Sequence, residues 1–303
     1  MAGLKRNRNI FVHLEGGLGN QLFQYAAGRA LAASLNAEIH IDSATGFLFD
    51  YRYRRKFELS RFSIATPKAS VYQRLPFLIL RCSGINLFSI ARRLLQEELP
   101  YFYLEPSFEY SPPPVTLHSL RSVWMSGYWQ CELYFKRYEE IIRTELDPPI
   151  PSKVYLRSLG ERMRRQNSVA VGIRLYEESN NPNAHCRDGR VKTPGEVSMA
   201  IERLQSMHEN LHFYVFCTHK ASFISELRLP TNTIILTPNM GYSDATDTLW
   251  LLSQCRHHIL TNSSLYWWGA WLSSSNHEAS NQTIMAADNF INQDSLCSHW
   301  LPF

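Results

Sequence analysis

A glycine-rich turn near the N-terminus has residue types and spacing that suit the binding of an anionic ligand. The run Gly16–Gln21 (GGLGNQ) separates an apolar, β-branched segment from a helical pattern. Glycine lets the backbone approach a ligand closely, and the N–H groups that open a helix attract anions. The amides of Asn20 and Gln21 can bind sugar hydroxyls or phosphate oxygens. A tight turn that binds nothing is the alternative interpretation.

The same turn does not favour a nicotinamide or flavin cofactor. The dinucleotide-binding fingerprint G-x-G-x-x-G would begin at Gly17 and continue through Gly19, and it would need a third glycine at position 22. That position is Leu22. The remaining interpretation is a phosphate- or sugar-binding turn with contacts from four residues: Gly17, Gly19, Asn20 and Gln21.

Strand and helix patterns alternate in both halves of the chain. Three successive runs read as strand, helix and strand, a βαβ unit that predicts a parallel sheet: Ile10–Leu14, Asn20–Ala33 and Ala37–Ile41. After the proline-rich segment Asp147–Pro151, alternation resumes from Arg157 to Leu272, as in a doubly wound sheet. We therefore predict two α/β domains, with a ligand in the cleft between them at the carboxyl ends of the strands. The predicted domains are residues 1–150 and residues 151–303.

Composition and charge exclude several classes of protein. The chain has 303 residues, of which 45% are hydrophobic and 19% charged, so it can bury a large core and is not intrinsically disordered. Its formal net charge of +4 is well short of the basic surface of a nucleic-acid-binding protein. The sequence contains no uncharged apolar run of the roughly 18 residues that a transmembrane helix needs.

Cysteine and histidine spacing predicts neither a disulfide framework nor a metal site. The six cysteines are widely spaced, which favours reduced, buried thiols. No pair of His or Cys residues has the spacing of a zinc site. Because no apolar segment of signal-peptide length opens the sequence, we expect a cytoplasmic protein. The basic segment Arg52–Lys56 leaves open a peripheral contact with the inner face of a membrane.

Three stretches together resemble one enzyme family. They are His13–Ala26 (HLEGGLGNQLFQYA), Gly127–Phe135 (GYWQCELYF) and Asn262–Trp271 (NSSLYWWGAW). Their order and residues are similar to those of glycosyltransferase family 11, the α-1,2-fucosyltransferases. Phe57–Leu59 and Asp247–Cys255 add weaker similarity. The resemblance extends over nearly the whole chain, which looks like a divergent bacterial-type member.

The resemblance implies a fold, a reaction and its partners. The fold would be GT-B-like, with two Rossmann-like domains, the acceptor on the N-terminal domain and the GDP-sugar on the C-terminal one. The reaction would be inverting, metal-independent transfer of L-fucose from GDP-β-L-fucose to O2 of a terminal galactose, as in O-antigen biosynthesis. The acceptor would be a galactose-terminated oligosaccharide or lipid-linked glycan, and no nucleic acid would bind. Three residues are candidates for acceptor contacts: His13, Glu15 and Trp129.

The segment Val171–Glu178 (VGIRLYEE) stands where the family has the pattern His-x-Arg-Arg-x-Asp. Of the two family arginines, one is matched, by Arg174. Gly172 replaces the histidine, Leu175 the second arginine and Glu177 the aspartate. An arginine at the departing diphosphate stabilises the negative charge that develops there without any metal. We therefore expect Arg174 to bind the donor and to act in catalysis.

The implied reaction also needs a general base that removes the proton of the acceptor hydroxyl. Glu177 stands nearest the position of the family's acidic residue, and a carboxylate in a cleft can have the raised pKa that suits this role. Glu178 is its neighbour, and Glu15 and His13 beside the glycine turn are further alternatives. Solvated carboxylates that merely open a loop are the non-catalytic interpretation.

Further donor contacts are implied at the starts of two predicted helices. In the wider fucosyltransferase group, the equivalent of Asp247 resembles a guanine-binding residue, because a carboxylate can accept two N–H groups of guanine. Asp244 opens the same helix and is the alternative. Asn262, Ser263 and Ser264 precede the next helix, where hydroxyls and free N–H groups converge on a phosphate. Serines that only cap the helix are the alternative there.

Two other functions remain open on the sequence. Because Gly172 and Leu175 depart from the family pattern, one alternative is a glycosyltransferase of the same fold that uses a different nucleotide sugar. Because the arginine pair of the family is incomplete, the other alternative is a non-catalytic sugar- or nucleotide-binding protein. For phosphate binding, the missing second arginine has three candidate substitutes in the following loop: Arg187, Arg190 and Lys192.

We predict that Arg174→Ala leaves the fold intact and lowers the rate of sugar transfer at least about a hundredfold, as loss of a charge-stabilising contact does. The transfer rate and the circular dichroism spectrum of both proteins check this. Turnover like that of the wild type in the variant would remove Arg174 from the reaction.

Overall fold

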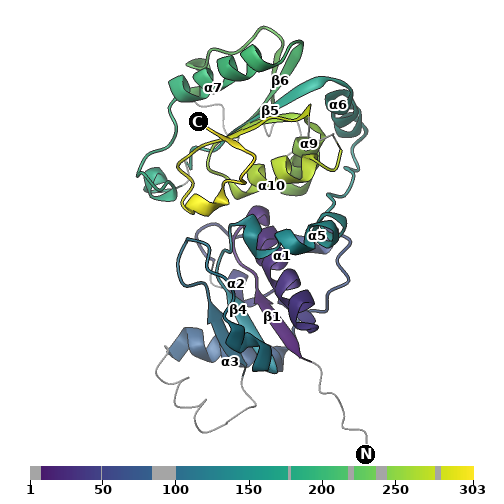
Figure 1. Cartoon of the computed structure of the whole chain (residues 1–303), viewed down its shortest axis with the longest axis vertical. Coiled ribbons are helices and arrows are strands. Elements are labelled where there is room, and N and C mark those ends of the chain that lie inside the picture. Colours follow the sequence, from purple (N-terminus) through teal and green to yellow (C-terminus); the bar gives the residue numbers. More distant parts are fainter. Residues whose placement is uncertain are drawn as a thin grey trace, which may run out of the picture. The chain divides into compact units, whose positions relative to one another are not determined.

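A computed structural model describes residues 8–48, 50–83, 100–176, 179–217, 222–236, 244–276 and 281–303. The chain forms two compact units, Met1–Leu146 and Asp147–Phe303. Each unit is a sheet with helices packed on it (Figure 1). Within the described ranges, no helix is both long enough and apolar enough to cross a membrane.

The first unit is built on a four-stranded sheet with the order β2-β1-β4-β3. Its helices and strands are β1 (Asn9–His13), α1 (Leu18–Leu35), β2 (Glu38–Asp42), α2 (Thr45–Leu48), α3 (Val71–Ser83), β3 (Tyr101–Leu104), β4 (Ser122–Ser126) and α5 (Glu139–Glu145). Every neighbouring pair of strands is parallel. The chain returns to the sheet on the other side of β1, so the carboxyl ends of β1 and β4 form a switch point, where α/β folds bind ligands.

Alternating side chains along β1 place helices on both faces of this sheet. Val12 faces α1, where a Cβ on Gly28 would overlap a Val12 methyl group, so the absent side chain lets helix and strand pack closely. Phe11 faces the other way and stacks on Trp124 of β4, with ring centroids 5.2 Å apart. Trp124 in turn stacks on Phe77 of α3. The carboxyl end of β1 is therefore held from both sides.

The second unit is built on a six-stranded parallel sheet. Its helices and strands are α6 (Val154–Arg165), β5 (Asn167–Ile173), α7 (Pro194–Met207), β6 (Leu211–Cys217), α8 (Ser222–Ser225), β7 (Thr233–Leu236), α9 (Ala245–Gln254), β8 (His257–Leu260), α10 (Ser264–Ser273), β9 (Ile284–Ala286) and β10 (Leu301–Pro302). The order β7-β6-β5-β8-β9-β10 is that of a Rossmann sheet, whose switch point lies between β5 and β8.

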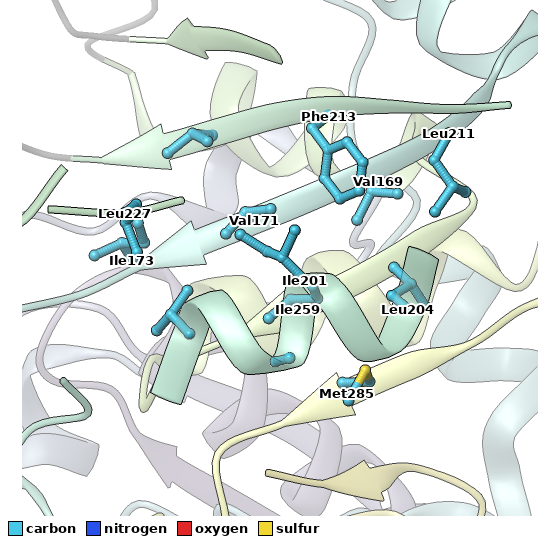
Figure 2. Packing of buried hydrophobic residues seen from close by; sticks show 13 residues of the cluster. Val169, Val171, Ile173, Ile201, Leu204, Leu211, Phe213, Leu227, Ile259 and Met285 are labelled. Carbon is cyan, nitrogen blue, oxygen red and sulfur yellow. The ribbon is translucent and has the colours of Figure 1, made fainter. Parts of the chain in front are cut away.

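The core of the second unit lies between this sheet and α7. Figure 2 shows Ile201 and Leu204 of α7 among Val169, Val171 and Phe213 of the neighbouring strands β5 and β6. A capping box at Thr193 starts the helix, with Pro194 at its first position. On the opposite face of the sheet lie α9 and α10 (Figure 1). Because β5 is covered on both faces, its residues are apolar in succession instead of alternating.

The predicted fold class, two parallel α/β units of Rossmann type, is confirmed. Four short strands were not expected from the sequence: β3, β4, β9 and β10. Strand β9 has three residues and β10 two, which is too few for an alternating or continuous apolar pattern to be recognised. The first helix is longer than expected and begins at Leu18, inside the glycine-rich run.

Candidate active site

The carboxyl ends of β5 and β8 lie side by side at the switch point of the second sheet. Thr261, directly after β8, donates its backbone N–H to the carbonyl of Gly172 at 3.0 Å. Its hydroxyl oxygen accepts the backbone N–H of Arg174 at 2.8 Å. These bonds fix the exit of β5, so Arg174 stands at the edge where parallel sheets bind ligands.

Arg174 is half-buried, and its guanidinium lies over an aromatic ring that the sequence did not single out. Its Cζ is 4.7 Å from the ring centroid of Tyr176. The Tyr176 ring also stacks on the imidazole of His185, with centroids 4.1 Å apart. An arginine against an aromatic face loses conformational freedom and keeps its charge. Tyr176 and His185 therefore join the candidate site, and their only sequence signal was their closeness to Arg174 in the chain.

The three cations considered as substitutes for a second arginine are each bonded within the second unit. Arg187 donates to the carbonyl of Asp288 at 2.9 Å. Arg190 forms a bidentate pair with Glu196, at 2.8 and 2.9 Å, and this pairing holds the pKa of the Glu196 carboxyl well below its usual range. Lys192 is buried and lies 2.7 Å from Asp288. These three cations therefore hold the loop in place through contacts with Asp288 and Glu196.

Packing explains the two departures from the family pattern at Gly172 and Leu175. A Cβ on Gly172 would lie 2.6 Å from Cδ2 of Tyr266. The Tyr266 hydroxyl is held 3.3 Å from the carbonyl oxygens of Ile173 and Phe216. The side chain of Leu175 packs against the apolar core. The tyrosine ring thus occupies the space that a histidine at position 172 would need, and position 175 belongs to the core.

Three predicted donor contacts lie at the N-terminus of α10. Ser263 is the N-cap, and its hydroxyl accepts the N–H of Tyr266 at 3.4 Å. Ser264 is the first residue of the helix and is half-buried. The Asn262 amide donates to the carbonyl of His185. Capping and phosphate binding are compatible at a helix N-terminus, so phosphate binding by these residues stays a prediction.

The two acidic residues at the start of α9 have different environments. Asp244 is the N-cap, and its carboxylate accepts the N–H of Thr246 at 2.7 Å. Asp247 lies in the first turn and is buried. Asp247 is the residue predicted to recognise guanine, and Asp244 is the alternative. That role stays a prediction.

The glycine turn in the first unit is held by the side chain of Gln21. Gly16 has a φ of +76°, a left-handed conformation that favours glycine. The Gln21 amide donates to the carbonyls of Gly16 and Lys56, at 2.9 and 2.8 Å, and its oxygen accepts the N–H of Glu58 at 2.9 Å. Gln21 is fully buried. Its amide therefore joins the turn to the segment after α2.

The other three residues predicted from this turn lie at the start of α1. Gly17 is the N-cap of the helix, and Gly19 is buried in its first turn. The Asn20 oxygen accepts a hydrogen bond from Gln130 at 2.9 Å. The guanidinium of Arg55 lies 3.6 Å from the point where a Cβ on Gly17 would stand. Donor binding by this turn stays a prediction, and Arg55 is a cation beside it that the sequence analysis considered only as part of the basic segment Arg52–Lys56.

His13, at the end of β1, is buried between two carboxylates. Its Nδ1 lies 3.4 Å from Asp42 and its Nε2 lies 3.6 Å from Glu15. Burial alone would lower the pKa of His13, but the hydrogen bonds and charges of Asp42 and Glu15 outweigh it, and the pKa is raised. Asp42 is fully buried, whereas the Glu15 side chain is 28% exposed. Glu15 is thus the member of the cluster that a ligand can reach.

Trp129, a predicted acceptor contact, and its neighbour Tyr128 face different environments. The indole of Trp129 is buried, with 1% exposure, whereas Tyr128 is 36% exposed. The carboxylate of Glu105 accepts both backbone N–H groups of this turn, at 2.6 and 2.9 Å. Burial raises the pKa of Glu105, and these two bonds partly offset it. Tyr128 therefore presents the aromatic surface at this edge, and acceptor binding by Trp129 stays a prediction.

Three predicted features need separate mention. Glu177, the predicted base, and Glu178 lie outside the described residues.

In the part of the chain that the structure describes, no group of three or more His, Cys, Asp or Glu residues is arranged to hold a metal ion. The thiols predicted to be reduced and buried are so at five positions: Cys131, Cys186, Cys217, Cys255 and Cys297.

We predict that Gly172→Ala lowers the free energy of unfolding by about 1–3 kcal/mol, because the new methyl group overpacks against Tyr266. Gly195→Ala is the matched control, since its Cβ would meet nothing closer than 3.9 Å. The control is expected to stay within about 0.5 kcal/mol of the wild type. Urea denaturation measures both, and equal stability of the two variants would contradict the packing explanation.

We also predict a pH dependence for His13. Because its pKa is raised above 6.5, its contribution to stability is complete below pH 6.5 and is lost as the pH rises through the raised value. The stability difference between wild type and His13→Gln should therefore shrink as the pH rises. His40→Gln is the control of opposite sign, because burial lowers the pKa of His40. Urea denaturation across pH measures both, and a difference for His13 that grows with pH would contradict the assignment.

Comparisons with known proteins agree with this architecture. The family model described as Glycosyl transferase family 11 matches residues 9–301. An alpha-1,2-colitosyltransferase from Escherichia coli is 30% identical over 274 residues, covering 87% of this chain and 87% of that protein. The O-antigen biosynthesis glycosyltransferase WbnK, also from Escherichia coli, is 25% identical over 292 residues, covering 86% and 89%.

A solved structure supports the fold. A mutant of Arabidopsis thaliana FUT1 in complex with GDP is similar with a TM-score of 0.51 at 12% identity, over 88% of this chain and 69% of that one. At this identity the likeness concerns the fold alone. The match of the family model over nearly the whole sequence identifies the chain as a member of glycosyl transferase family 11.

Proposed function

We propose that this glycosyltransferase moves L-fucose from GDP-β-L-fucose to O2 of a terminal galactose, with inversion to an α-1,2 linkage. The observation that carries the proposal is the position of Arg174 at the switch point of a Rossmann sheet in a family 11 chain. A guanidinium there meets a diphosphate bound at the carboxyl ends of β5 and β8. Its charge offsets the charge that develops on the leaving group, so transfer proceeds without a metal.

The second unit would bind the donor. Ser263 and Ser264 open α10 within reach of the same sheet edge, and the N-terminus of a ten-residue helix favours a phosphate there. Asp247, buried in the first turn of α9, would accept N–H groups of guanine. Adenine has no such pair of donors, so a carboxylate at this place selects a GDP-sugar.

The first unit would bind the acceptor at the carboxyl ends of β1 and β4. Tyr128 offers an exposed ring for the apolar face of a galactose, and Glu15 offers a carboxylate for its hydroxyls. In the reaction, the acceptor oxygen attacks C1 of fucose, the C1–O bond to GDP breaks, and a base takes the hydroxyl proton. Glu177 remains the base predicted from the sequence. Among the described residues Glu15 is our candidate, because it lies 3.6 Å from His13, which Asp42 holds from its other side.

Colitose, which is fucose without its 3-hydroxyl, is a second candidate for the transferred sugar. The relative at 30% identity is named as an alpha-1,2-colitosyltransferase. The family histidine is absent, and the Tyr266 ring fills the space above Gly172. A site with one polar group fewer fits a donor with one hydroxyl fewer, because a binding group left unpaired is unfavourable. The alternative donor anticipated from Gly172 and Leu175 would then be a GDP-linked dideoxy sugar.

A donor comparison tests the proposal. The protein is incubated with GDP-fucose or GDP-colitose and a panel of β-galactosides, with and without EDTA, and the products are analysed by mass and linkage. We expect a deoxyhexose at O2 of galactose, in equal yield with EDTA. A faster reaction with GDP-colitose would replace fucose by colitose as the natural sugar.

Calorimetric titration with GDP, UDP, ADP and CMP completes the test. Tight binding of GDP without any transfer would favour a non-catalytic binding protein. A preference for another nucleotide would contradict the guanine role of Asp247, and with it the proposed donor.

A further inference from the structure

Tyr176 has a backbone conformation that residues with a side chain rarely adopt. Its φ is +55°, in the left-handed region. Its carbonyl accepts the N–H of Ser179 at 2.8 Å. Strain of this kind persists only where surrounding contacts hold it, and it concentrates at functional sites. A glycine would be the unstrained choice, so the tyrosine side chain needs an explanation.

The side chain of Tyr176 is fixed through its ring and its hydroxyl. Its ring stacks on His185 with an interplanar angle of 8°. Its hydroxyl donates to the carbonyl of Asn262 at 2.6 Å. The Asn262 amide in turn donates to the carbonyl of His185, and the His185 ring lies 3.1 Å from the hydroxyl of Ser179. These contacts form a closed circuit, so the ring has one position relative to the exits of β5 and β8.

The guanidinium of Arg174 lies against this fixed ring, 4.7 Å from its centroid. The backbone of Arg174 is separately held by Thr261. A long side chain fixed only at its backbone samples many rotamers, and each rotamer lost on binding weakens the contact. A guanidinium that rests on an aromatic face is restricted beforehand without losing its charge.

We infer that Tyr176 is a positioning residue for Arg174, which holds the guanidinium in the orientation that meets the departing diphosphate. The inference rests on the proposed function. It also explains how the site works with one arginine of the family pair, because Leu175 packs in the core and the loop cations are paired with Glu196 and Asp288. Tyr176 contacts no substrate in this scheme and transfers no proton. It acts through Arg174 alone.

The substitution Tyr176→Gly is the sharpest test, because glycine suits the left-handed backbone and the variant should fold. Asn210→Gly is the matched control, since Asn210 also has a φ of +55°, is exposed and lies in the same unit away from the switch point. We expect kcat to fall about 10- to 100-fold in Tyr176→Gly, as for a misplaced catalytic group, with a smaller change in the donor KM. Asn210→Gly should keep the kcat of the wild type.

The variant Tyr176→Phe separates the ring from the hydroxyl. It retains the surface under the guanidinium and loses the hydrogen bond to Asn262. We expect its kcat to fall less than about tenfold, as for one hydrogen bond. A larger loss in Tyr176→Phe than in Tyr176→Gly would contradict positioning by the ring.

A double-mutant cycle with Arg174→Ala decides whether Tyr176 acts through the arginine. If it does, adding Tyr176→Gly to Arg174→Ala produces no further loss. An equal fold-loss in both backgrounds, or an unchanged kcat in Tyr176→Gly, would overturn the inference. The wild type in the same assay tests the proposed function separately. If the wild type transfers no fucose, the cycle is measured as affinity for GDP, or for UDP or ADP if one of these binds better, with the same criterion of non-additivity.

Discussion

The hydrogen bonds between Thr261 and the exit of β5 are the constraint on which the candidate donor site depends. They join β5 and β8, which are adjacent in the sheet but far apart in the sequence. These two strands flank the switch point of the sheet. Parallel strands cannot pair through a short turn, so this adjacency requires the helical crossovers between them. The apolar residues on both faces of β5 hold the strand in register. Arg174 takes its position at the edge of the sheet from that register.

Packing, more than residue type, determines which polar groups are available for chemistry in the second unit. Arg190 and Lys192 carry the charge that a diphosphate needs, yet ion pairs with Glu196 and Asp288 fix them within the loop. Ser263 caps a helix and still presents its helix N-terminus to the same edge. An arginine that is already held in one orientation loses less conformational freedom when it binds a diphosphate than a mobile arginine does.

In the first unit, too, some polar residues hold the backbone in place and others are exposed to a ligand. The amide of Gln21 holds three backbone groups together, although its residue type would suit a ligand equally well. Asp42 is buried and bonded to the backbone N–H of Thr45, and it anchors His13. Glu15, at the exposed end of this cluster, has the access that the buried members lack. The stretch His13–Ala26 thus contains both residues that hold the backbone in place and the exposed carboxylate that is predicted to contact the acceptor.

The sequence by itself determined the fold class and the family, and it predicted a role for Arg174. These follow from patterns that are local in the chain: apolar runs that alternate with helical periodicity, a glycine turn between strand and helix, and motifs of adjacent residues. It did not reveal β9 and β10, because strands of two or three residues have no period, and it did not single out Tyr176 or Tyr128. Only the tertiary structure showed that Tyr266 occupies the space over Gly172, that Trp129 is buried and that the guanidinium of Arg174 lies over the Tyr176 ring. The physical reason is that packing and ion pairing join residues distant in the chain, and single-sequence patterns contain no information about which distant residues meet.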